Sequence, residues 1–128
     1  MAQLLVKDKV NPDLLVSSPA KRALTTAIFF AEAFDIKSDD IQLDQDIYEA
    51  IPHTIHKIIS ALPDDANTVF LFGHNPTFTE VANEFTDDFI DNVPTCGIVK
   101  IMSSAENWAS FYEGNSKVTA RFFPKEVL

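Results

Sequence analysis

The stretch that most constrains the fold is the nonapeptide 68–76, Thr-Val-Phe-Leu-Phe-Gly-His-Asn-Pro. Its four consecutive apolar residues predict a strand buried on both faces, as in parallel sheets, and Gly73 ends that strand. Asn75 suits the cap of a following helix, and Pro76 suits its first position. Ligands of α/β sheets bind at such strand-to-helix junctions, where backbone N–H groups favour an anion. His74 therefore occupies a predicted phosphate-binding or catalytic position, and the residues alone leave open a capping or packing role.

Length and charge narrow the class of protein. A chain of 128 residues, 46% of them hydrophobic, is long enough for one domain with its own core. No apolar run approaches the roughly 20 residues that span a bilayer, and no signal peptide pattern is present, so we expect a cytoplasmic protein without a membrane partner. Nineteen acidic against ten basic residues give a charge of −9, which argues against nucleic acid as a partner. The single cysteine, Cys96, is expected to be buried.

Strand and helix patterns alternate along most of the chain, which predicts an α/β layered domain. Residues 108–112 and 118–123 are interpreted as a hairpin whose turn is 113–117. The expected elements, in order, are the end of a helix at 1–10, a buried strand at 13–17, a helix opened by Ser18 and Pro19, a short strand at 41–43, a helix capped by Thr54, the strand of 68–72, a helix after Pro76, and strands at 98–102, 108–112 and 118–123.

Two cationic residues lie at the start of the helix that follows Ser18-Pro19. Lys21 and Arg22 fall in its first turn, where the helix dipole disfavours positive charge. An anion bound between Arg22 and the helix N-terminus would account for this placement. A solvated arginine or a surface ion pair is the alternative.

Three segments together resemble one family. Residues 17–27, Ser-Ser-Pro-Ala-Lys-Arg-Ala-Leu-Thr-Thr-Ala, resemble the Ser-Ser-Pro-x-x-Arg-Ala-x-x-Thr-Ala motif of the histidine phosphatase superfamily, which includes the phosphoglycerate mutases. Residues 73–76, Gly-His-Asn-Pro, resemble the second histidine motif of that family. The spacing of 94–97, Pro-Thr-Cys-Gly, is similar to the SixA-type phosphohistidine phosphatases. The resemblance extends over nearly the whole chain from Asp13.

This resemblance implies a fold and a chemistry. The fold is a three-layer α-β-α sandwich of the phosphoglycerate mutase type, and the reaction is phosphate hydrolysis through a phosphorylated histidine. The resemblance assigns Arg22, His74 and Asn75 to the phosphate pocket, with His74 also catalytic. Fixed cationic donors stabilise a transferring phosphoryl group, and no metal or other cofactor is required. The implied substrate is a phosphohistidine of a signalling protein or a small phosphomonoester.

Glu49 is a further candidate. It resembles the Leu-x-Glu position that supplies a proton-donating acid in the mutase branch of the family. A phosphohistidine leaving group is easily expelled, so a surface carboxylate without a catalytic role is the other interpretation. His53 and His56, near the start of the next helix, are interpreted as surface residues.

The family's nucleophile motif is missing from the sequence. None of the three histidines, His53, His56 and His74, follows an arginine. By resemblance, the first strand of the fold, which carries an Arg-His motif, would precede residues 1–10, so about forty residues of a βα unit are missing. We interpret 1–128 as a single domain that is N-terminally incomplete. A genuinely truncated chain would expose an unpaired strand edge and would need a strand from elsewhere, as in a homodimer.

Three hypotheses follow from these observations. The first is a SixA-type phosphatase whose nucleophile lies on the missing segment, so that the 128-residue chain alone is inactive. The second is a catalytically inactive phosphate-binding or interaction domain derived from that family. The third is a remnant that folds only as a dimer or with a partner.

Overall fold

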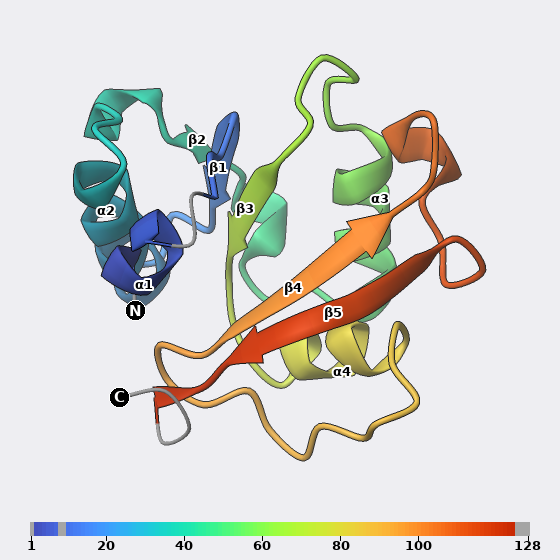
Figure 1. Cartoon of the computed structure of the whole chain (residues 1–128). Coiled ribbons are helices and arrows are strands. Elements are labelled where there is room, and N and C mark those ends of the chain that lie inside the picture. Colours follow the sequence, from blue (N-terminus) through green and yellow to red (C-terminus); the bar gives the residue numbers. More distant parts are fainter. Residues whose placement is uncertain (1, 8–9, 125–128) are drawn as a thin grey trace. The chain divides into compact units, whose positions relative to one another are not determined.

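The computed structural model describes residues 2–7 and 10–124. The chain forms two compact units, and each is considered by itself (Figure 1). The first unit comprises Met1–Glu49 and Asp65–His74, and the second comprises Ala50–Asp64 and Asn75–Leu128. In the described part of the chain, no helix is both long and apolar enough to cross a bilayer.

The first unit is built on a parallel sheet in the order β2-β1-β3. Leu14 of β1 lies opposite Val69 of β3, and Ser17 lies opposite Phe72. Its helices and strands are α1 (Ala2–Lys7), β1 (Leu14–Ser17), α2 (Lys21–Ala33), the 3₁₀ turn η1 (Ser38–Asp40), β2 (Gln42–Leu43), the 3₁₀ turn η2 (Gln45–Ile47) and β3 (Val69–Phe72). The parallel α/β arrangement of the sequence prediction is confirmed in this unit.

The core of the first unit lies between α2 and the sheet. Leu15 and Val16 in the central strand are 2% and 0% exposed, and Ala27 and Ala31 of α2 are fully buried. The Phe30 ring packs edge-on against Phe72, with ring centroids 5.3 Å apart. Small residues on one stripe of α2 let the helix approach the sheet closely, and larger aromatic rings fill the remaining space.

The second unit pairs two helices with an antiparallel hairpin. Its elements are α3 (Pro52–Ser60), α4 (Thr77–Asn83), β4 (Ile98–Ser103), the 3₁₀ turn η3 (Trp108–Ser110) and β5 (Ser116–Phe122). Ile98 lies opposite Phe122 in the hairpin, and Ser103 lies opposite Ser116. Within this unit, Ala82, Ile90 and Phe123 form a buried cluster against which Val99 packs.

Five local expectations are wrong, each for a physical reason. The segment 108–112 is not a strand, because the Asn107 side chain accepts a hydrogen bond from the Ser110 N–H and favours a 3₁₀ turn. The partner of β5 is therefore β4, and 113–117 is not the turn of a hairpin between 108–112 and 118–123. Thr54 is inside α3 rather than at its cap, since Pro52 supplies the first helical position.

The other two corrections concern Cys96 and β3. Cys96 is exposed, because it lies in the turn before β4 with a positive φ of 63°. The strand β3 is half-buried at all four positions rather than buried on both faces. Among the described residues β3 is an edge strand, with β1 paired along one of its edges.

Candidate functional site

The carboxyl edge of the parallel sheet brings the two motifs together. Strand β1 ends at Ser17 and leads through Ser18 into α2, whereas β3 ends at Phe72 and leads into His74. Because β1 and β3 are adjacent and parallel, both junctions lie at the same edge of the sheet. Such an edge is where α/β folds bind their ligands.

A direct hydrogen bond links the two strand-to-helix junctions. The His74 Nε2 atom lies 2.9 Å from the Ser18 Oγ atom, although the two residues are 56 positions apart. Ser18 is fully buried, and its Oγ also accepts a hydrogen bond from the Ala20 N–H at 3.2 Å. A hydroxyl can donate one hydrogen bond and accept two, so Ser18 can serve both neighbours. The imidazole is thus held by a buried polar group at the sheet edge.

The position of Ser18 corrects a sequence expectation. The helix α2 begins at Lys21 with Ala20 as its N-cap residue, so Ser18 is not the cap. Its hydroxyl instead holds His74, a role that sequence reasoning missed. The two serines of the Ser-Ser-Pro motif were the available signal, but no local pattern connects a hydroxyl to a side chain so distant in sequence.

Arg22 lies where the sequence predicted it, in the first turn of α2. Its side chain is exposed and, among the described residues, makes no hydrogen bond or ion pair. No acidic residue occupies the first turn of α2, so no carboxylate there compensates the charge. The guanidinium of Arg22 is therefore available to an external anion, and its contact with a phosphate stays a prediction.

Glu49 follows an aromatic neighbour of His74. The Tyr48 ring meets the imidazole edge-on, with centroids 5.9 Å apart and planes at 90°. Glu49 itself is exposed and has a positive φ of 61°. The backbone thus places Glu49 next to a residue that touches His74, and its role as a proton donor stays a prediction.

Asn75 belongs to the second unit, and its side chain is fully engaged there. The Oδ1 atom accepts hydrogen bonds from the Thr79 N–H at 3.1 Å and the Thr79 hydroxyl at 2.8 Å. The Nδ2 atom donates to the carbonyl of Val93 at 2.7 Å and to Asn92 Oδ1 at 3.4 Å. The helix α4 begins at Thr77 with Pro76 as its N-cap residue, so the predicted positions of Asn75 as the cap and Pro76 as the first helical residue are wrong by one residue. The Asn75 side chain still accepts from a backbone N–H of the first turn, that of Thr79. Phosphate binding by Asn75 stays a prediction, and its side chain could take part only by giving up one of these contacts.

The other two histidines are in the second unit, on α3. His53 is exposed, as expected. His56 is partly buried, and its Nε2 lies 2.8 Å from a carboxylate oxygen of Glu84. This pairing gives His56 a structural partner within its own unit.

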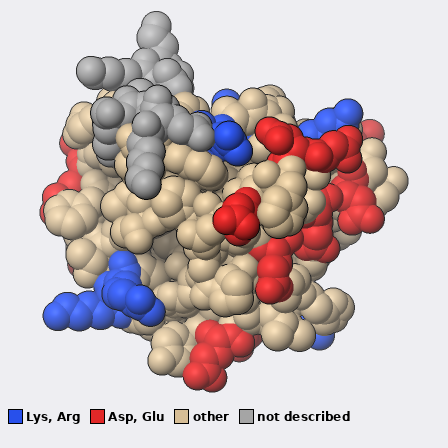
Figure 2. Space-filling view, turned by 90° about the horizontal axis from the view of Figure 1, so that it is seen from below, with Lys and Arg blue, Asp and Glu red and all other residues tan. Residues whose placement is uncertain are grey.

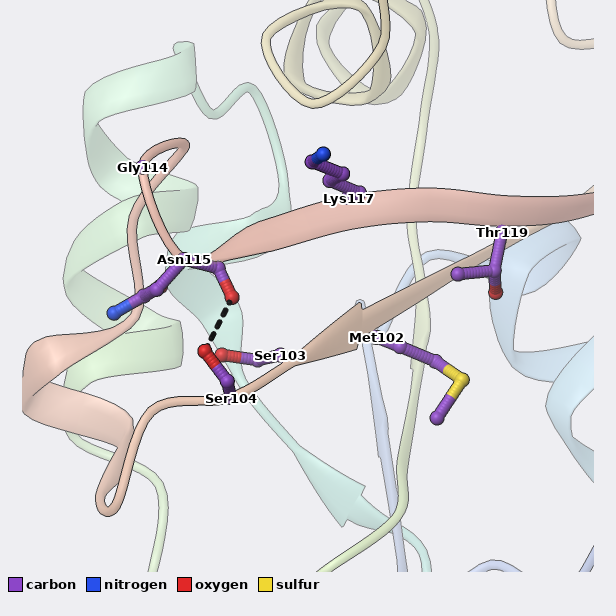
Figure 3. Close-up of a pocket in the computed structure, with 7 residues that line it drawn as sticks. All are labelled: Met102, Ser103, Ser104, Gly114, Asn115, Lys117 and Thr119. Carbon is purple, nitrogen blue, oxygen red and sulfur yellow. Dashed lines mark hydrogen bonds between the residues drawn. The ribbon is translucent and has the colours of Figure 1, made fainter.

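A pocket in the second unit contains none of the predicted site residues. It lies on the β4–β5 hairpin and has a volume of about 410 Å³ (Figure 3). Its lining residues are Met102, Ser103, Ser104, Gly114, Asn115, Lys117 and Thr119. The Ser104 hydroxyl there donates to the backbone carbonyl of Asn115, so part of the polar lining is already paired.

The negative charge of the chain is visible on its surface. Figure 2 shows one face on which Asp and Glu side chains gather into patches, with Lys and Arg side chains separate from most of them. A phosphate site in this protein must therefore be locally positive within an unfavourable overall field. This requirement makes the guanidinium of Arg22, which has no ion pair among the described residues, important for any anion bound near it.

Ser18→Ala is expected to lower the free energy of unfolding by about 1 kcal/mol, because the imidazole loses a partly buried hydrogen bond. The substitution should also shift the ¹⁵N resonance of His74 Nε2 in an NMR titration. Ser17→Ala is the matched control, because Ser17 is equally buried but its hydroxyl donates to the Ser18 carbonyl. If both variants leave the Nε2 resonance unchanged, the Ser18–His74 bond is absent in solution.

Comparison with known proteins supports the fold. No family model matches the sequence, and no curated protein matches it. A solved structure described as a putative phosphohistidine phosphatase SixA from Nakamurella multipartitia matches with a TM-score of 0.78 and 20% identity, over 96% of this chain and 77% of that one. A second structure, described in the same words and from Agrobacterium tumefaciens, matches with a TM-score of 0.75 and 25% identity over the same shares. The chain therefore has the α/β fold of the SixA structures, which confirms the likeness to the histidine phosphatase superfamily that its motifs predicted.

Proposed function

We propose that the protein is a phosphohistidine phosphatase of SixA type, which hydrolyses phosphohistidine on a signalling protein or a small phosphomonoester. The observation that carries the proposal is the hydrogen bond between Ser18 and His74, 2.9 Å long, which joins the two motifs at one sheet edge. The likeness to the two SixA structures supports the same conclusion at the level of the fold.

In this proposal, His74 and Arg22 hold the oxygens of the phosphoryl group. His74 in its protonated form donates through Nε2 to Ser18 and retains its Nδ1 proton for an anion. The planar guanidinium of Arg22 can donate to two oxygens at once, and Arg22 lies in the first turn of a helix whose N-terminus also favours an anion. Glu49 would supply a proton to the leaving group, and Asn75 would complete the pocket.

The nucleophile is assigned to a segment that precedes the 128 residues. By family resemblance it is a histidine of an Arg-His motif on the first strand of a three-layer α-β-α sandwich. Its nitrogen attacks phosphorus and the leaving group departs, and water then cleaves the phosphorus–nitrogen bond to release phosphate. On this view, 1–128 is one domain that is N-terminally incomplete, and the chain alone is inactive.

A second candidate is a phosphate-binding or interaction domain without catalysis. The observation that favours it is the lack of any arginine directly before His53, His56 or His74. Such a domain would bind phosphate through Arg22 and His74 but would transfer no phosphoryl group.

A comparison of two proteins decides between these functions. The protein extended by its upstream coding sequence should release phosphate from a phosphohistidine-containing protein, and the 128-residue chain should not. Mass spectrometry of the extended protein, quenched in acid-free buffer during turnover, should find one phosphorylated histidine outside residues 1–128. No phosphate release by an extended protein that contains an Arg-His motif would reject the enzyme and favour the binding domain.

A further inference from the structure

The Tyr48 side chain packs against the imidazole of His74. The two ring planes meet at 90°, with the ring centroids 5.9 Å apart, and both residues belong to the first unit. Perpendicular, edge-to-face packing is a favoured geometry of aromatic pairs. Tyr48 is 49% exposed, so a tyrosine with access to water is nevertheless packed on the imidazole. The His74 side chain thus has two partners, the Tyr48 ring and the Ser18 hydroxyl.

The turn η2, which directly precedes Tyr48, is attached to the end of the sheet. The Asp44 N–H donates to the carbonyl of Ser17, the last residue of β1, at 2.9 Å. Ile47, within the turn, is only 2% exposed. The Tyr48 N–H donates to the Gln45 carbonyl at 3.1 Å and closes the turn. A buried side chain and two backbone hydrogen bonds therefore fix the backbone of Tyr48 relative to β1.

The two partners of His74 constrain different motions of its ring. The Ser18 hydroxyl holds the Nε2 atom at 2.9 Å. Nε2 lies closer to the axis of the Cβ–Cγ bond than Nδ1 does, so this hydrogen bond opposes rotation about that bond only weakly. Rotation about an sp³–sp² bond of this kind has broad preferences of its own. The perpendicular Tyr48 ring opposes the rotation, because turning the imidazole plane would break the packing between the rings.

We propose that Tyr48 is a positioning residue for His74, whose ring fixes the imidazole plane and so directs Nδ1 toward the phosphoryl group. Nδ1 has no hydrogen bond among the described residues, which leaves it for an external anion. The inference rests on the proposed function for what Nδ1 binds, whereas the fixed plane is a property of the protein alone. The aromatic ring has this role and the phenol hydroxyl does not, because the contact is between the rings.

Nuclear magnetic resonance of the 128-residue chain tests the fixed plane without any reaction. Nuclear Overhauser effects should connect the ring protons of Tyr48 and His74. The order parameter of the His74 ring C–H bonds should be near 0.85, roughly that of a rigid backbone, and should fall below about 0.6 in Tyr48→Ala. Tyr48→Phe keeps the ring and should keep the wild-type value. His53, which is exposed, is the internal reference and should be the same in all variants. If the short chain is unfolded, the same spectra of the extended protein decide.

Kinetics of the extended protein test the consequence for the reaction. Tyr48→Ala should lower kcat for a phosphohistidine-containing protein by about 10–100-fold, because a misaligned group costs transition-state stabilisation. KM should change by less than about threefold, since contacts remote from the phosphoryl group bind a protein substrate. Tyr48→Phe should retain at least about half of the wild-type kcat, whereas Tyr48→Leu, which keeps apolar bulk without a flat ring, should lose about as much as Tyr48→Ala. Tyr112→Ala is the matched control, because Tyr112 is also an exposed tyrosine but belongs to the second unit.

Three results would overturn the proposed role of Tyr48. The first is the absence of Overhauser effects between the two rings. The second is an order parameter of the His74 ring that is unchanged in Tyr48→Ala. The third is an equal loss of kcat in Tyr48→Phe and Tyr48→Ala, which would assign the effect to the hydroxyl. An extended protein that releases no phosphate would reject the proposed function instead, and the spectra would still confirm or overturn the fixed plane.

Discussion

Arg22→Ala is expected to lower the rate of phosphate release by the extended protein by about 10²–10³-fold, the usual cost of removing one fixed donor from a developing oxyanion. The side chain is exposed and makes no ion pair among the described residues, so its loss should leave the fold intact. The relevant measurement is kcat and KM for a phosphohistidine-containing protein, with a urea denaturation curve of each variant.

Lys21→Ala is the matched control for this prediction. Lys21 carries the same charge in the same turn of α2 and is also exposed. If Arg22 acted only through the overall electrostatic field of the protein, Arg22→Ala and Lys21→Ala would lower the rate of phosphate release equally. A loss of activity in Arg22→Ala of less than tenfold, or an equal loss in Lys21→Ala, would remove Arg22 from the phosphate pocket.

Arg22→Lys separates charge from geometry at this position. Lysine keeps the positive charge but lacks the planar fork that can bind two oxygens of a phosphoryl group. We therefore expect the lysine variant to retain only part of the wild-type activity. Full activity in Arg22→Lys would indicate that a simple cation is sufficient.

Leu15→Ala is expected to lower the free energy of unfolding by about 2–5 kcal/mol, the range measured for leucine truncation in well-packed cores. Leu15 is 2% exposed and lies in β1, between the other two strands of its sheet. Such a loss is a large fraction of the stability of a domain of this size. Urea denaturation followed by circular dichroism would measure it.

Leu43→Ala is the control for this core substitution. Leu43 is in the same sheet but is 53% exposed, so its truncation should change the stability by no more than about 0.5 kcal/mol. A change smaller than 1 kcal/mol for Leu15→Ala would mean that the first unit is loosely packed in solution.

Local sequence patterns were sufficient to identify most elements of the fold. The apolar runs gave β1 and β3, and the small-residue stripe gave α2, because these patterns depend on residues close together in the chain. The expectation for 108–112 was wrong because side-chain amides there bond to the backbone. Asn115 accepts from the Tyr112 N–H and donates to the Ser110 carbonyl, which competes with a strand.

The candidate site likewise has features that the sequence predicted and features that only the structure showed. The sequence alone determined that Arg22 lies in the first turn of the helix after β1 and that His74 follows β3, since each motif is a continuous stretch of chain. Only the tertiary structure decided that Ser18 holds His74, that Tyr48 packs on the imidazole and that the Asn75 amide is engaged by Thr79. The edge position of β3 is also a tertiary result. The physical reason is that hydrophobic periodicity records whether a residue is buried, whereas the identity of its partner depends on the order in which strands are placed in the sheet.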